Sequence, residues 1–100
     1  MIKLALLARL EAKAGKETEV EAFLKSGGDL ALDEPKTITW YAFRLGPTTF
    51  GIFDTFEEED GRQAHLTGEI AKALMQKAPD LFSSAPDIQL ADVLALKTQA

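Results

Sequence analysis

With 100 residues, 46% of them hydrophobic, the chain has the size and composition of one ordinary domain around a single core. Its formal net charge is -5, and its 11 basic residues form no cluster, so nucleic acid is not an expected partner. The absence of cysteine excludes disulfides, thiolate metal sites and a thiol nucleophile, and it suits the cytoplasmic location that we expect.

The first predicted element is a strand over residues 2–12. Its even positions are all apolar and its charged residues are at odd positions, which is the period of two of a strand with one buried face. Arg9 and Glu11 interrupt the apolar run and no cleavage site follows it, so neither an export signal nor a membrane span is expected.

A helix over residues 17–32 is predicted next. Val20, Phe23 and Leu24 recur at helical spacing, Gly27-Gly28 is expected to loosen the helix, and Pro35 ends the segment.

Residues 37–45 and 48–56 are rich in β-branched and aromatic residues and are separated by Gly46-Pro47, so they are predicted to form a hairpin of two antiparallel strands.

The last third of the chain predicts a helix and a final strand. Acidic residues 57–60 suit the positive end of a helix that begins after Thr55 or Phe56, and Gly68 is a candidate break within it. Pro79 and Pro86 are predicted to bracket a short connection. Alternating apolar residues then predict a strand from Ile88 to near Lys97.

The predicted order is βαββαβ within a single domain of residues 1–100. It is typical of the ferredoxin-like α+β fold, an antiparallel four-stranded sheet with both helices on one face. The other face then needs a cover, and a second copy of the chain is the simplest one. We therefore expect a homodimer of the dimeric α/β-barrel type, with no membrane partner.

His65 is the only histidine, and its ordinary pKa near neutrality suits a general base, a hydrogen-bond donor or a ligand. In a continuous helix His65 would point away from the core into solvent. If the helix breaks at Gly68, His65 shares a face with Gly61 and Ala64, whose small size permits close approach to the sheet. The residues alone favour a structural role, because a lone histidine more often packs or caps than reacts.

Aromatic residues concentrate on the two strands of the predicted hairpin. The period of two puts Tyr41 and Phe43 on the face opposite Trp40, and Phe53 on the face opposite Phe50 and Phe56. These rings suit either the core and a dimer interface or an apolar pocket for a flat aromatic ligand.

Several charged residues have simple structural interpretations. Asp54 interrupts an apolar stripe, and we expect it to pair with Arg44 across the hairpin. Structural ion pairs are also expected for Arg9, Glu11 and Asp92, and Arg62 is expected to be a solvated helix residue. One histidine among scattered carboxylates has no metal-ligand spacing, and the glycines form no phosphate-binding loop or dinucleotide fingerprint. We predict no metal, nucleotide or flavin site.

The segment from Phe50 to Leu66 resembles the antibiotic biosynthesis monooxygenase (ABM) family. In that family a strand ends in an acidic residue and an aromatic one, an acidic turn follows, and Ala-His ends a helix; Asp54, Phe56, Ala64 and His65 take these places. Residues 13–16 and 92–95 also fit, so the resemblance covers almost the whole chain. It implies a homodimer whose sheets meet back to back, with a pocket between each sheet and its helices.

The resemblance also implies a type of chemistry. Characterised ABM members include oxygenases that oxidise quinols or polycyclic phenols without metal or flavin, and a branch that degrades haem. The haem-degrading branch uses an asparagine where this chain has Ala8 and a tryptophan where it has Phe56, and this chain contains no asparagine. Haem breakdown is therefore not expected.

We expect a cofactor-independent monooxygenase that acts on a small quinol-like or phenolic compound. The predicted catalytic residues are His65, Trp40 and Tyr41, and the predicted substrate-binding residues are Phe43, Ile52, Asp54 and Phe56. The alternative is a non-catalytic dimer of the same fold that binds an aromatic ligand or serves a stress response.

Overall fold

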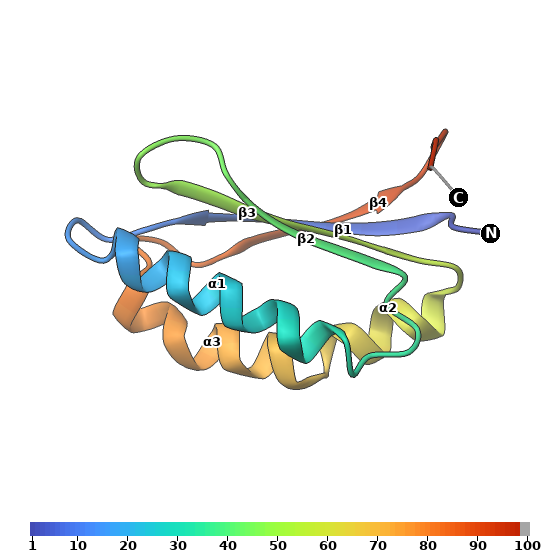
Figure 1. Ribbon diagram of the computed structural model, residues 1–100, viewed down its shortest axis with the longest axis horizontal. Helices are drawn as coiled ribbons and strands as arrows, with labels where there is room; N and C mark the ends of the chain where they lie inside the picture. The colour runs from blue at the N-terminus through green and yellow to red at the C-terminus, as the bar shows by residue number, and fades with distance from the viewer. Residues whose placement is uncertain (99–100) are drawn as a thin grey trace.

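Four strands and three helices make up the fold of residues 1–98, the part of the chain that the computed structural model describes (Figure 1). They are β1 (Leu4–Glu11), α1 (Glu17–Ala31), β2 (Thr39–Arg44), β3 (Thr49–Phe56), α2 (Glu59–Leu66), α3 (Glu69–Leu81) and β4 (Asp87–Asp92). The predicted βαββαβ order is confirmed, with the second helix divided into α2 and α3.

The four strands form one antiparallel sheet in the order β2-β3-β1-β4. The three helices of residues 1–98 all lie on the same face of this sheet, and the other face carries none of them (Figure 1). The protein therefore has the predicted ferredoxin-like α+β architecture.

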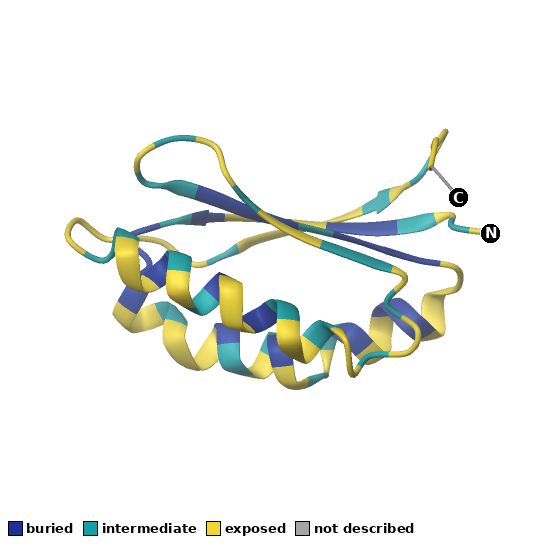
Figure 2. Cartoon of the chain, in the orientation of Figure 1, coloured by how far each residue is buried: buried dark blue, intermediate teal, exposed yellow. Residues whose placement is uncertain are grey.

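The core lies between the sheet and the helices (Figure 2). The even residues of β1 face the helices and pair in register with even residues of β3, as Leu10 does with Phe50. The helices contribute Val20 and Leu24 from α1 and Leu74 from α3 to this layer. Because side chains alternate along a strand, the even residues of β3 and those of β1 from Leu6 to Leu10 are buried, as the periodicity predicts.

The helix break predicted at Gly68 is present. Gly68 is extended, with a φ of -86° and a ψ of -175°, and its N–H donates to His65 O at 3.1 Å. A Cβ at Gly68 would lie 3.0 Å from Glu34 Oε2. The missing side chain therefore leaves room for the Glu34 carboxylate beside the break.

The glycines of α1 do not loosen the helix as predicted. The helix continues through Gly27-Gly28, and a Cβ on Gly27 would lie 3.2 Å from two atoms of the Trp40 indole ring. The two glycines instead let the ring pack against the helix.

The predicted bounds of the last two elements are wrong. Pro79 lies inside α3, two residues before its last residue Leu81; its missing N–H removes one backbone bond of the last turn, and the Lys13 ammonium donates to its carbonyl at 2.6 Å. β4 ends at Asp92, which pairs in register with Leu4, the first residue of β1, and only one further backbone bond follows, from Val93 N–H to Lys3 O at 2.8 Å.

Two predicted roles of basic residues are also wrong. Arg62 is only 8% exposed: its guanidinium bonds the Glu59 carboxylate and donates to the carbonyls of Ala5 and Ala91, which ties α2 to the sheet. Arg44 lies 3.7 Å from Glu21 of α1 and its guanidinium carbon lies 4.6 Å from the centre of the Phe50 ring, so it does not pair with Asp54.

The ion pairs predicted for three further residues do not form within residues 1–98. Glu11 accepts hydrogen bonds from the hydroxyls of Thr48 and Thr49 instead of pairing with a cation. Arg9 and Asp92 have no ion-pair partner in this part of the chain.

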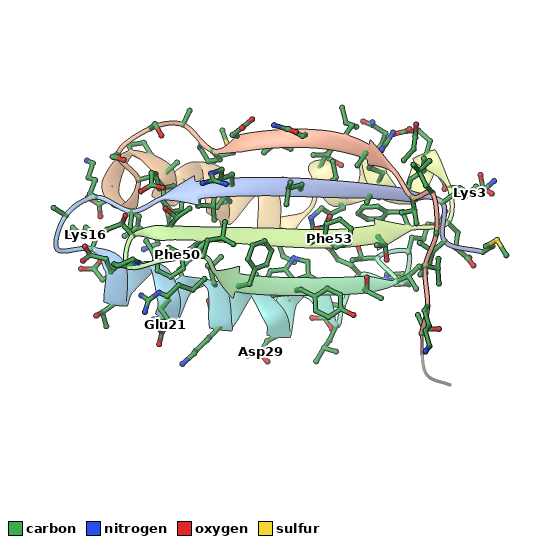
Figure 3. All side chains as sticks on the ribbon, turned by 90° about the horizontal axis from the view of Figure 1, so that it is seen from above. Lys3, Lys16, Glu21, Asp29, Phe50 and Phe53 are labelled. Carbon is green, nitrogen blue, oxygen red and sulfur yellow. The ribbon has the colours of Figure 1, made fainter. Side chains whose placement is uncertain are left out.

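The helix-free face of the sheet exposes apolar side chains. Figure 3 looks onto this face, with Phe53 near its middle. Leu7, Tyr41 and Phe43 lie around Phe53, since Leu7 and Tyr41 pair with it in register, and Tyr41 is 58% exposed. No helix within residues 1–98 has the length and apolar character needed to cross a membrane.

Candidate functional site

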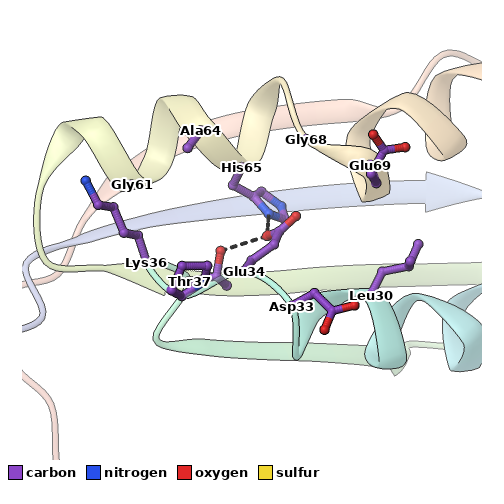
Figure 4. Close-up of a pocket in the computed structure, with 11 residues that line it drawn as sticks. Leu30, Asp33, Glu34, Lys36, Thr37, Gly61, Ala64, His65, Gly68 and Glu69 are labelled. Atoms are coloured by element: carbon purple, nitrogen blue, oxygen red, sulfur yellow. Dashed lines mark hydrogen bonds and ion pairs between the residues drawn. The ribbon is translucent and has the colours of Figure 1, made fainter.

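His65 lies between two carboxylates that come from other parts of the fold. His65 Nε2 is 2.8 Å from Asp54 Oδ2, and His65 Nδ1 is 2.6 Å from Glu34 Oε1. His65 is the last residue but one of α2, Asp54 belongs to β3, and Glu34 lies in the loop after α1, near His65 in Figure 4. These three side chains form what we call the Asp54–His65–Glu34 cluster.

Local structure aims each side chain at the others. Asp54 is on the helix-facing side of β3, where it pairs in register with Leu6 and Trp40. The break at Gly68 ends α2 just after His65, so the imidazole is directed to the sheet. Glu34 is held by a tight turn in which the Thr37 N–H donates to Glu34 O at 3.2 Å and the Thr37 hydroxyl to Glu34 Oε1 at 2.8 Å.

The cluster sets the charge of His65. Burial favours the neutral imidazole and so lowers its pKa, but hydrogen bonds and charges from Asp54 and Glu34 outweigh burial and raise the pKa to about 9. At neutral pH the ring is therefore an imidazolium that donates to both carboxylates. Because neither nitrogen is free to accept a proton, His65 cannot serve as the general base in this state.

An open groove borders the cluster on the side of Glu34 (Figure 4). Its volume is about 490 Å³, which is within the usual range of ligand pockets. It is lined by Leu30, Asp33, Glu34, Pro35, Lys36, Thr37, Gly61, Ala64, His65, Gly68 and Glu69. The groove can therefore hold a small ligand against the carboxylate of Glu34.

A second, much smaller cavity lies on the side of Asp54, between the sheet and α2 and α3. Its volume is about 30 Å³, enough for water but not for an aromatic ring. His65 borders both the groove and this interior cavity.

The residues predicted for the site are divided among several places. Asp54 bonds His65, the Phe56 ring lies 5.6 Å from the imidazole, and Ile52 lines the interior cavity. Trp40 packs on α1 and borders two other hollows, which His65 does not line. Tyr41 and Phe43 lie on the helix-free face, away from the cluster.

The sequence-based interpretation missed Glu34. It lies 31 residues before His65 in a loop without periodicity, so no local pattern connects the two. Asp54 indicated a buried partner, since it is an acidic residue in an apolar stripe, but it gave no signal for a second carboxylate beside that partner.

The acidic residues of the cluster do not form a metal site. No group of three or more His, Asp or Glu side chains within residues 1–98 is arranged to hold a metal ion. In the cluster, both imidazole nitrogens already bond carboxylates.

The fold is shared with solved structures. Two proteins named "putative antibiotic biosynthesis monooxygenase" superimpose on the chain. One, from Nitrosomonas europaea, has a TM-score of 0.81 and 12% identity, with 92% of this chain and 90% of that chain covered. The other, from Caulobacter crescentus, has a TM-score of 0.78 and 18% identity, with 94% and 92% covered. The protein thus has the fold of the ABM class.

One solved structure is similar enough in sequence to establish the family of this chain. The NE2512 protein of unknown function from Nitrosomonas europaea is 52% identical, with a TM-score of 0.97 over 100% of this chain and 97% of that chain. The chain belongs to the same family as NE2512. No protein-family model and no curated protein matches the sequence.

Proposed function

We propose that this protein is a monooxygenase that binds a small phenolic or quinol-like compound in the groove beside Glu34. One observation carries the proposal. Glu34 Oε1 is held by His65 and Thr37, whereas Oε2 has no hydrogen bond within residues 1–98. This second oxygen can accept a hydrogen bond from a hydroxyl group in the groove.

The proposed chemistry assigns different roles to Glu34 and His65. The Glu34 carboxylate accepts the phenolic proton, and the positive imidazolium beside it stabilises the phenolate that forms. Dioxygen is the oxidant. A quinol and dioxygen give a hydroxyquinone and water: one oxygen atom enters the ring, the other leaves as water, and the quinol supplies all four electrons. The deprotonated ring is itself the reductant, so the proposal involves no metal or flavin.

The groove suits such a ligand. Leu30, Pro35 and Ala64 provide apolar surface, and Gly61 and Gly68 leave room between the helices and the loop. A one-ring or two-ring phenol fits within about 490 Å³, with its hydroxyl at the end where Glu34 lies.

We expect the substitution Glu34→Gln to lower the rate of oxygen uptake roughly 10²-fold, because an amide cannot take the phenolic proton. The measurement is dioxygen consumption with an oxygen electrode over a panel of one-ring and two-ring quinols. Asp33→Asn is the matched control, because Asp33 lines the same groove but lies outside the cluster. Oxygen uptake by the wild type no faster than by Glu34→Gln would contradict the proposal.

A non-catalytic ligand-binding protein is the second candidate, and two observations favour it. Both imidazole nitrogens of His65 are occupied, and the cavity between sheet and helices, at about 30 Å³, cannot hold an aromatic ring. Calorimetry that detects binding of a phenol in the groove, with no oxygen uptake, would select this candidate over the oxygenase.

We also propose that a second copy of the chain covers the helix-free face of the sheet. Two exposed side chains, Leu7 and Tyr41, and two partly exposed ones, Phe43 and Phe53, support this proposal, because a contiguous apolar face of this kind is typical of an interface.

Introducing a charge into that face should therefore prevent association. We expect Phe53→Lys to sediment as a monomer at micromolar concentration while the wild type sediments as a dimer. Met75→Lys, which places the same charge on an exposed position of α3, is the control and should remain a dimer. A wild-type protein that sediments as a monomer would refute this interface.

A further inference from the structure

One oxygen of the Asp54 carboxylate is buried without a partner. Asp54 is 1% exposed, and its Oδ2 accepts from His65, but Oδ1 has no hydrogen-bond partner within residues 1–98. A buried, charged oxygen without a donor is costly, and such atoms in folded proteins nearly always bond to protein or to ordered water.

The interior cavity lies against this carboxylate. Eight of its ten lining side chains are apolar, among them Leu6, Ala8 and Ile70; the remaining two are Asp54 and His65. Because both nitrogens of His65 already donate to carboxylates, the imidazole offers no donor to Asp54 Oδ1. The volume of about 30 Å³ exceeds the roughly 15 Å³ that one water molecule needs.

The first turn of α3 also borders this cavity. The first backbone hydrogen bond of α3 is donated by the Lys72 N–H to Gly68 O, at 3.0 Å. No side chain accepts a capping hydrogen bond at the start of this helix. The N–H groups of Ile70 and Ala71 therefore have no acceptor within the helix, and both residues line the cavity. A water molecule needs this combination, an acceptor for its hydrogen and a donor for its oxygen.

We infer that the interior cavity is the binding site of one water molecule, which donates to Asp54 Oδ1 and accepts from an N–H of the first turn of α3. This water completes the hydrogen bonding of Asp54 and joins β3 to the start of α3. The inference is independent of the proposed activity, because it depends on Asp54, the cavity and the helix and not on any substrate in the groove.

A crystal structure of the wild-type protein at high resolution tests the site directly. We expect ordered water density about 2.8 Å from Asp54 Oδ1. An empty cavity in a structure that shows other buried waters would overturn the inference, and so would an Asp54 side chain rotated so that Oδ1 meets a protein donor.

Solution NMR provides a second test that needs no crystal. We expect magnetisation transfer from a long-lived water to protons of Ile70 and Ala71. Ala8→Val fills the cavity and should abolish this transfer, whereas Ala42→Val, the same change at an exposed strand position outside the cavity, should leave it intact. A wild-type protein without this transfer would rule out the bound water.

Discussion

The free energy of unfolding is expected to fall by roughly 3 kcal/mol as the pH rises from 6.5 to beyond 9, because over this range the folded state keeps a proton on His65 that the unfolded chain has already released. The folded protein holds the proton more tightly than the unfolded chain, since its pKa is raised from 6.5 to about 9 by Asp54 and Glu34. The stabilisation is fully present below 6.5, the pKa of His65 in the unfolded chain. It is lost as the pH rises through about 9, the pKa of His65 in the folded protein.

Urea denaturation at a series of pH values between 6 and 9.5 measures this loss. His65→Gln is the matched control, because its side chain does not titrate and its stability should change much less over the same window. NMR titration of the imidazole gives the folded pKa directly. A midpoint near the ordinary value would show that the two carboxylates do not control the charge of His65.

Replacing His65 with leucine is expected to destabilise the protein by roughly 3–5 kcal/mol, because two carboxylates lose the cation between them. Asp54 is 1% exposed and the Glu34 side chain is 18% exposed, so solvent replaces little of the lost interaction. Leucine fills most of the imidazole volume, so the loss measures the missing charge and hydrogen bonds more than a cavity.

A second substitution separates charge from packing. In the His65→Leu background, Asp54→Leu removes the most deeply buried unpaired carboxylate and should recover much of the stability. Equilibrium urea unfolding of the two single variants and the double variant gives the coupling energy. Gln63→Leu, at an exposed position of α2, is the control and should change stability by less than about 0.5 kcal/mol. Additive effects of the two substitutions would contradict a direct interaction.

These expectations bear on how the site can act. A histidine held as a cation is a fixed positive charge, which suits the stabilisation of an anion and not the removal of a proton. The proton acceptor in the proposed reaction is consequently Glu34, whose carboxylate borders the groove. The activity test and the stability tests therefore examine different members of the cluster.

Local patterns were sufficient to predict most of the secondary structure. The strands, the order of the elements and the helix break at Gly68 follow from periodicity and from glycine, which act over a few residues. The same period of two correctly placed Trp40 and Tyr41 on opposite faces of the sheet, since side-chain alternation depends only on an extended backbone. The order of the elements identified the fold class, and the resemblance over residues 50–66 added the ABM family and a place in its pattern for His65 and Asp54.

What the sequence determined by itself is thus the set of elements and the face on which each residue lies, because both depend on neighbours along the chain. Only the tertiary structure decided which charges meet. Arg44, expected to pair with Asp54, turns to Glu21 of α1, and the partner of Asp54 is His65. Glu34 lies 31 residues before His65 in the sequence, and the loop after α1 brings its carboxylate to the imidazole. The course of that loop depends on the packing of the whole domain.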